Sequence, residues 1–102
     1  MSDGAALIAA ERRRQVEVEG WTPEHDTEHW DGELALAAVC YALPLYCRHD
    51  LAQELWPWHP DWLKQTPHDR VRELVKAGAL IAAEIDRLRA LAVARADHGI
   101  TS

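Results

Sequence analysis

Polar side chains that could bind a small ligand gather in the first quarter of the chain. Glu11, Arg12 and Gln15 are close in sequence, and helical spacing places them at the edge of an apolar face rather than opposite it. Trp21 and His25 follow shortly afterwards and supply aromatic rings. A guanidinium group binds anions, and an aromatic ring stacks on a planar partner. The combination predicts a pocket for a planar, anionic ligand.

Histidine and carboxylate side chains between residues 17 and 33 form a second candidate site. His25 and His29 are four residues apart, and Asp26 and Glu33 belong to a set of seven acidic residues in a stretch without Lys or Arg. Imidazole and carboxylate groups bind metals, so a cation site is one interpretation. The other is a solvated acidic loop, which we favour because Asp26, not Glu, follows the first His of the pair. We assign no metal ligand here and keep Asp26 and Glu33 as candidate contacts of the ligand.

The segment WPWHPDWLKQTP, residues 56–67, is a third candidate, and we call it the aromatic connector. Three Trp and three Pro residues in twelve positions make it irregular. Trp rings fill large volumes and tolerate a wet edge, so the connector could be a lid over one end of the fold. The alternative is a stacking wall for a planar ligand, and Trp62 then joins the binding residues.

Several common catalytic motifs are absent from the sequence. The serines are Ser2 and Ser102, the glycines are isolated, and there is no Cys-x-x-Cys pair. Cys40 and Cys47 would lie about 10 Å apart on one straight helix, beyond the ~7 Å limit for a disulfide. We therefore predict no catalytic residue and two buried thiols.

Composition narrows the class of protein further. The chain has 102 residues, 48% of them hydrophobic, which suits one helical domain over residues 1–102. Its formal net charge of −6 gives no general attraction to nucleic acids or anionic membranes. No apolar run reaches the ~18 residues of a membrane helix, and no secretory signal pattern is present. We expect a cytoplasmic protein that binds neither membranes nor nucleic acid directly.

Helical periodicity predicts an all-α fold, a small bundle of three to five helices. The first helix is capped by Ser2 or Asp3 and ends at Glu19, before Gly20. Its expected buried face is Ala5, Ile8, Ala9, Arg12 and Val16.

An apolar central helix should follow. It is capped by Asp31, has Gly32 and Glu33 in its first turn, and ends or kinks at Pro44. Because this helix is apolar all round, we expect it to be central and to contact another subunit, which makes the protein a homo-oligomer. A shorter helix is expected over residues 45–55.

The C-terminal helix is the clearest element of the pattern. Thr66 caps it, Pro67 and Asp69 complete its start, and Gly99 ends it. Its expected buried face comprises Val71, Leu74, Val75, Gly78, Ile81, Ala82, Ile85, Leu88 and Ala92. Gly78 should allow another helix to approach closely.

Four segments carry a resemblance to known proteins: ERRRQ (residues 11–15), EGWTPEHD (19–26), GELALAA (32–38) and VKAGALIAAEI (75–85). With them the chain resembles a family of small uncharacterised phage and prophage proteins. The resemblance covers most of the chain and implies a phage accessory protein without an established activity. A more distant likeness is to the MazG-like all-α nucleotide pyrophosphatases, which bind magnesium through E-E-x-x-E and E-x-x-D patterns. Here Glu33 stands alone and Glu84 is two residues from Asp86, so the likeness implies an absent or rebuilt metal site.

Three hypotheses follow. The first, which we favour, is a non-catalytic binding module without a cofactor, which sequesters a nucleotide-type ligand or engages a host protein, such as a defence protein. The second is a diverged MazG-like phosphohydrolase, which needs magnesium and carboxylates that converge, with Glu11, Glu33, Glu73 and Glu84 as candidates. The third is a purely structural oligomer.

Overall fold

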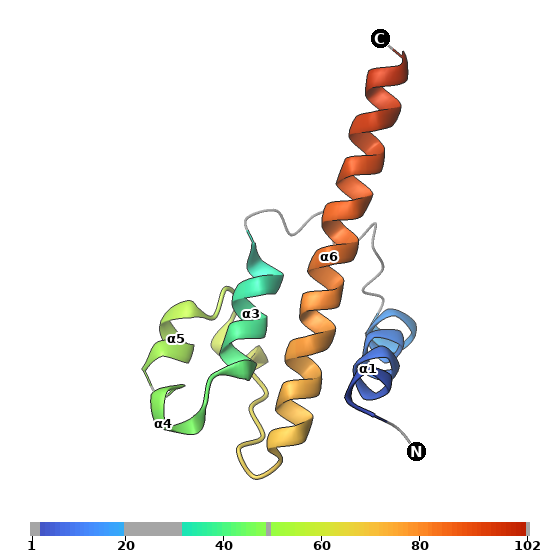
Figure 1. Cartoon of the computed structure of the whole chain (residues 1–102). Coiled ribbons are helices and arrows are strands. Elements are labelled where there is room, and N and C mark those ends of the chain that lie inside the picture. The colour runs from blue at the N-terminus through green and yellow to red at the C-terminus, as the bar shows by residue number, and fades with distance from the viewer. Residues whose placement is uncertain (1–2, 20–31, 49, 102) are drawn as a thin grey trace.

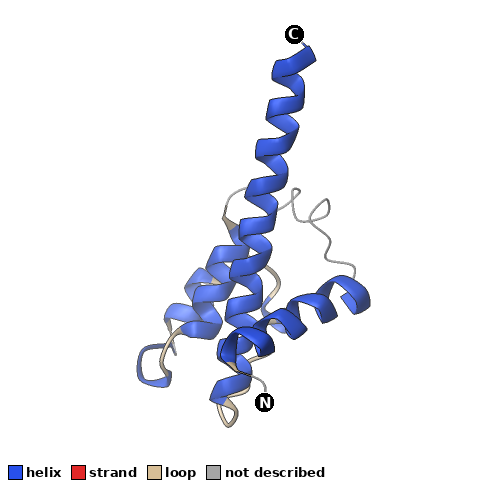
Figure 2. Cartoon of the chain, turned by 45° about the vertical axis from the view of Figure 1, so that its right-hand side comes forward, coloured by secondary structure: helices blue, strands red, loops and turns tan. Residues whose placement is uncertain are grey.

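The computed structural model of the chain describes residues 3–19, 32–48 and 50–101, and these form helices and connections without a strand (Figures 1 and 2). The elements are α1 (Gly4–Glu19), α3 (Glu33–Ala42), α4 (Leu45–Arg48), α5 (Leu51–Leu55), a 3-10 turn (Pro60–Trp62) and α6 (Arg70–Thr101). The predicted all-α class with a long C-terminal helix is therefore confirmed. None of the described helices combines the length and the apolar content needed to span a membrane.

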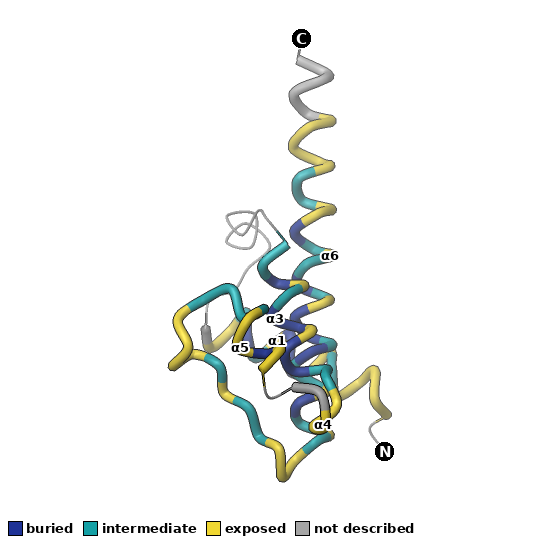
Figure 3. Tube along the Cα trace, turned by 90° about the vertical axis from the view of Figure 1, so that its left-hand side faces the viewer, coloured by how far each residue is buried: buried dark blue, intermediate teal, exposed yellow. Residues whose placement is uncertain are grey.

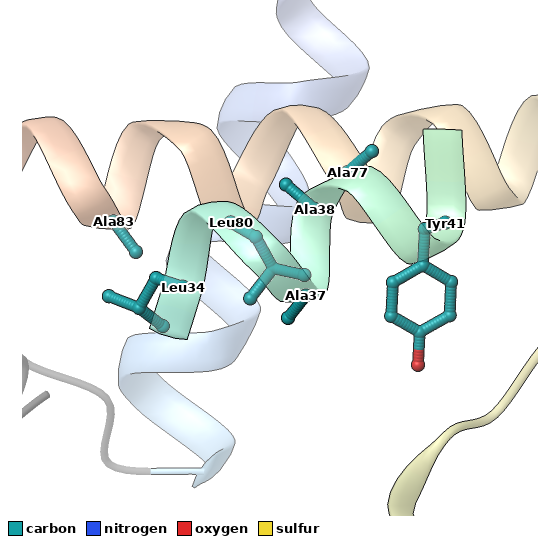
Figure 4. Close-up of a cluster of buried hydrophobic side chains, with 7 residues drawn as sticks. All are labelled: Leu34, Ala37, Ala38, Tyr41, Ala77, Leu80 and Ala83. Carbon is teal, nitrogen blue, oxygen red and sulfur yellow. The ribbon is translucent and has the colours of Figure 1, made fainter. Parts of the chain in front are cut away.

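Helix α6 is the axis around which the other helices pack. α3 and α1 lie on different sides of its N-terminal half, and α3 runs in the opposite direction to α6 (Figure 1). The core lies between α3 and α6 (Figure 4), and its buried residues are Leu34, Ala37, Ala38, Tyr41, Ala77, Leu80 and Ala83. Four of the seven are alanines, so the two helices can approach closely. α3 lies between α6 and α5, but Ala35 and Val39 are exposed, so α3 is not buried on all sides as its apolar sequence predicted.

The ends of α1 and α3 follow mostly from local signals. The Asp3 carboxylate accepts a hydrogen bond from the Ala6 N–H at 2.8 Å, which confirms Asp3 as a cap. α3 ends at Ala42, before Pro44, as predicted. Gly32, however, is the residue before the first turn rather than part of it, and its φ of 75° lies in the left-handed region that glycine tolerates best. The predicted cap Asp31 lies outside the described residues.

Three predicted boundaries are wrong. The expected helix over residues 45–55 is two short helices, because a new helix starts after Asp50. α6 begins at Arg70 rather than Pro67, because the Asp69 carboxylate, not Thr66, caps it by accepting the Arg72 N–H at 3.1 Å. α6 also continues through Gly99 to Thr101, since one glycine only lowers helix propensity.

The buried faces of two helices also differ from those predicted (Figure 3). On α1, Arg12 is buried as predicted, but Glu11 and Gln15 are buried with it, whereas Ala5 and Ala9 are exposed. α1 docks through charge: Arg72 of α6 donates to Glu11 at 2.8 Å, and Arg12 donates to Asp86 at 3.3 Å.

On α6, the face toward α3 carries the small residues Ala77 and Ala83, which are buried. The larger apolar residues predicted as its core face, among them Leu74, Ile81 and Leu88, are exposed instead. Small residues meet α3 because they allow the closest approach of the two helices.

One of the predicted thiols is buried. The Cys40 side chain is fully inaccessible, its Sγ donates to the Ala52 carbonyl at 3.4 Å, and burial raises its pKa. This bond ties α3 to α5. The side chain of Cys47 lies outside the described residues.

At Gly78 the side chain of Ile8 on α1 lies close against α6, the close helix contact that was predicted for this glycine. A Cβ atom at this position would lie 2.5 Å from the Ile8 Cδ1 atom and 2.7 Å from its Cγ1 atom. We expect Gly78→Ala to lower the free energy of unfolding by about 1–2 kcal/mol, because the overlap outweighs the ~1 kcal/mol gain in helix propensity. Urea unfolding followed by circular dichroism measures this difference.

Two further substitutions test whether overlap with Ile8 causes this loss of stability. Gly4→Ala, where nothing lies within 4 Å of the new methyl group, should not destabilise the protein. In an Ile8→Ala background, Gly78→Ala should become neutral or stabilising. An equal loss in both backgrounds would contradict the steric explanation.

Candidate functional site

A cavity of about 140 Å³ lies where α1, α3, α6 and the aromatic connector meet. Its lining residues are Glu11, Arg14, Gln15, Tyr41, Trp56, Trp58, Trp62, Lys64, Lys76 and Leu80. The volume exceeds the ~10–15 Å³ that a single water needs, but it is below the 300–1,000 Å³ typical of pockets that enclose a whole drug-sized ligand. The cavity therefore suits one ring system, with the remainder of a larger ligand outside.

Aromatic side chains make one wall of the cavity. The Trp56 ring stands edge-to-face against Tyr41, with centroids 5.8 Å apart, and against Trp58, with centroids 5.2 Å apart. Hydrogen bonds fix these rings: the Trp56 indole N–H donates to the His59 carbonyl at 3.0 Å, and the backbone N–H of Lys64 donates to the Tyr41 hydroxyl at 3.0 Å. The wall is therefore held in place before any ligand arrives.

The carboxylate of Glu11 holds the charged side of the cavity together. Arg14 donates to its two oxygens at 2.9 Å each, and Arg72 donates to one of them at 2.8 Å. Burial alone would raise the pKa of Glu11, but the two guanidinium groups outweigh burial and lower this pKa to about 2. Glu11 is therefore ionised at neutral pH.

Cations outnumber anions around the cavity. Its described lining residues include Arg14, Lys64 and Lys76 but only one acid, Glu11, although the whole chain carries a net charge of −6. The Lys76 ammonium donates to the Lys64 carbonyl at 3.0 Å and lies 5.3 Å from the centre of the Tyr41 ring. Burial, reinforced by the nearby Arg72, lowers the pKa of Lys76. Placing a negative charge beside Lys76 would offset that penalty.

Gln15 contributes an acceptor that has no hydrogen bond within the described part of the chain. The side chain is 3% exposed, and its Nε2 donates to Glu11 at 3.4 Å. Its Oε1 is buried and has no partner among the residues that the structure describes. An unpaired buried acceptor costs about 1–3 kcal/mol, so a ligand N–H that reached this oxygen would recover part of that cost.

The structure brings three of the eight predicted site residues together and places two others elsewhere. Glu11, Gln15 and Trp62 line the cavity, and Trp62 is 63% exposed, so it lies where the cavity meets solvent. Glu33 lies behind the wall and accepts the Trp58 indole N–H at 2.9 Å. Arg12 does not line the cavity and instead reaches Asp86. Trp21, His25 and Asp26 lie outside the described residues.

The remaining lining residues were not predicted individually. Trp56 and Trp58 belong to the aromatic connector, for which a ligand wall was one of two interpretations, and they both pack on the core and line the cavity. Arg14 lies three residues from Glu11 and pairs with it across one helical turn, a signal that the sequence did contain. Tyr41 and Lys76 are distant in sequence, and no local pattern connects them.

The carboxylates proposed as a magnesium site are separated and paired with donors. Glu33 binds Trp58, Glu73 accepts from the Thr66 N–H at 3.0 Å, and Glu84 accepts from Arg87. Nowhere in residues 3–19, 32–48 and 50–101 do three His, Cys, Asp or Glu side chains come together as metal ligands would.

A larger cavity of about 570 Å³ also borders Trp56 and Trp58. Its other lining residues are Gln53, Pro60, Leu63 and Gln65, so the described residues bring no charged side chain to it. Since none of its described lining residues would recognise an ionic ligand, the smaller cavity is the stronger candidate site.

Comparison of the chain with known protein families, with curated proteins and with solved structures gives no significant match.

Proposed function

We propose that the protein is a non-catalytic binding module whose cavity takes the ring of a nucleotide-type anion. The observation that carries the proposal is the buried Oε1 of Gln15, which has no partner among the described residues and lies in a cavity with aromatic walls. A nucleobase offers a planar face for the Trp and Tyr rings and an N–H group for Gln15. Its phosphate would lie outside the ring cavity, toward Lys64, Lys76 and Arg14.

The resemblance to phage and prophage proteins suggests the setting for this role. A phage accessory protein that sequesters a nucleotide would remove a signal from its host, for example one used in defence. The alternative, a MazG-like phosphohydrolase that needs magnesium, has less support, because its candidate carboxylates among the described residues are paired with hydrogen-bond donors and do not cluster.

The first test identifies what the protein retains. Native mass spectrometry of protein purified from bacteria without added ligand should show an extra mass in the range of a nucleotide. Calorimetric titration with nucleoside monophosphates and with the free bases then measures affinity, and the monophosphates should bind more tightly than the bases. No retained mass and no measurable affinity would contradict the proposal and favour a protein partner.

Gln15→Leu provides the decisive variant. Because Leu removes the acceptor at nearly the same volume, affinity for the tightest-binding nucleotide should fall about 10- to 100-fold. Gln65→Leu is the matched control, because Gln65 also carries a buried amide atom without a partner within the described chain, but it lines the larger cavity. A loss of affinity in Gln65→Leu with none in Gln15→Leu would place the ligand in the larger cavity instead.

A further inference from the structure

One face of α6 carries apolar side chains that the described part of the chain leaves exposed. We call it the α6 stripe, and its residues are Leu74, Gly78, Ile81, Ile85, Leu88 and Ala92. Its four large members, Leu74, Ile81, Ile85 and Leu88, are between 46% and 51% exposed. α3 packs on another face of the same helix, and α1 reaches the edge of the stripe, where Ile8 lies against Gly78. A row of half-exposed Leu and Ile side chains indicates a surface that another element covers.

The spacing of the α6 stripe indicates what covers it. Successive members are four, three, four, three and four residues apart, an average of 3.6. This alternation is the a/d pattern of a coiled-coil seam, which is narrower than the face that a helix turns to a globular core. The matching partner is therefore a helix with the same repeat.

The C-terminal part of α6 also needs a partner. The contacts of α6 with the other helices reach Asp86, whereas residues 92–96 are all exposed, and the helix extends past the other elements (Figures 1 and 3). The radius of gyration, 15.1 Å, exceeds the ~13 Å expected for a compact domain of 100 residues. An isolated helical arm of this length is marginal in water, so packing against another helix would stabilise it.

We propose that the α6 stripe docks against the α6 stripe of a second copy of the chain, with the two helices antiparallel. Ile81 of one copy then lies opposite Ile85 of the other, and the same shift sets Leu88 opposite Gly78 and Leu74 opposite Ala92. Leu74 meets the small Ala92, and Leu88 meets the layer in which Ile8 already packs against Gly78, so the seam has no empty layer. The C-terminal part of each helix covers the N-terminal half of the other.

The parallel arrangement fits the same residues less well. It would set Ala92 against Ala92, which leaves that layer underfilled. It would also bring Arg95, which lies seven residues after Leu88 and continues the spacing of the stripe, against its own copy in the seam. Like charges at that position disfavour parallel pairing.

The test measures the mass of the protein in solution and how that mass changes when one charged residue is introduced into the α6 stripe. Sedimentation equilibrium of the full chain should give twice the chain mass of 11.5 kDa. Leu88→Glu should raise the dissociation constant of the dimer at least about 100-fold, because the two-fold symmetry places the change in the seam twice. Val93→Glu is the control: Val93 is 62% exposed on the same helix but lies off the stripe, so the dimer should persist. Circular dichroism verifies that both variants are folded.

Cross-linking tests the direction of pairing. Under oxidation, an equimolar mixture of Leu74→Cys and Ala92→Cys chains should form a mixed disulfide. Leu88→Cys alone should give no more disulfide-linked dimer than the wild-type chain, which carries Cys40 and Cys47. A monomeric wild-type chain, or equal loss of the dimer in Leu88→Glu and Val93→Glu, would overturn the interface. Efficient self-linkage of Leu88→Cys without the mixed disulfide would overturn the antiparallel arrangement.

Discussion

Replacing Arg70 with alanine should lower the free energy of unfolding by about 3 kcal/mol. Its guanidinium group donates to the Tyr41 carbonyl at 2.8 Å and to the Ala42 carbonyl, the last acceptors of α3, and to Glu73 at 3.2 Å. Glu73 is completely buried. The substitution takes a cation from the C-terminal end of one helix and leaves a buried carboxylate short of a donor, a change that typically costs about 3–5 kcal/mol. Arg70 keeps about a third of its side chain exposed, so we expect the lower end.

Urea unfolding of Arg70→Ala and Arg70→Lys measures this contribution. Lysine keeps the charge but cannot donate to both carbonyls and Glu73 through a planar fork. The free energy of unfolding of Arg70→Lys should therefore lie between those of wild type and Arg70→Ala. A loss below about 1 kcal/mol in Arg70→Ala would show that the junction of α3 and α6 does not depend on this side chain.

Glu11→Gln should have the second-largest effect, about 2 kcal/mol at neutral pH, and the effect should depend on pH. The pKa of Glu11 in the folded protein is about 2, below its ordinary value of 4.5, since Arg14 and Arg72 favour the ionised form. A lowered pKa stabilises the fold at pH values above the ordinary pKa, and this contribution disappears as the pH falls through the folded pKa. The full shift corresponds to about 3 kcal/mol, which we reduce because both arginines are more than a third exposed.

The pH profile separates this ionic contribution from simple loss of packing. The difference in stability between wild type and Glu11→Gln should be constant above about pH 4.5 and shrink between about pH 4.5 and pH 2. Glu17→Gln, which changes an exposed acid on the same helix, should not alter stability measurably. A difference between wild type and Glu11→Gln that stayed constant down to about pH 2.5 would contradict the ionic origin.

Much of the fold could be predicted because the relevant signals are local. Asp3 as a cap, Pro44 as the end of a helix and the close contact at Gly78 each depend on one residue and its neighbours. The choice of buried face could not be predicted in this way. Helix α6 has one face made mostly of alanines, with Leu80 among them, and another of Leu and Ile, and hydrophobicity alone favours the face with more large residues. The structure buries the alanines because α3 lies close to them.

For the candidate site, too, the residues that share one helix could be predicted together and those brought in by tertiary packing could not. Glu11 and Gln15 lie on one helix at a spacing that places them together, so their association follows from periodicity. Tyr41 and Lys76 join the cavity only because α3 packs along α6, a tertiary arrangement without a local sequence signal. Arg12 was grouped with Glu11 and Gln15 because it also faces inward, but its long side chain reaches Asp86 instead. Spacing therefore predicts which residues lie on one face of the helix, but not which partner each side chain contacts.

The perpendicular arrangement of Trp56 and Trp58 also gives the protein a built-in optical reporter. Their ring planes differ by 88° and their centres are 5.2 Å apart. Electronic transitions of two indoles this close couple with each other, and the asymmetric surroundings make the coupled absorption optically active. Both rings border the cavity, so anything that enters it alters their surroundings while leaving the helices intact. Near-ultraviolet circular dichroism can thus follow occupancy without a label, while the far-ultraviolet spectrum records the helices independently.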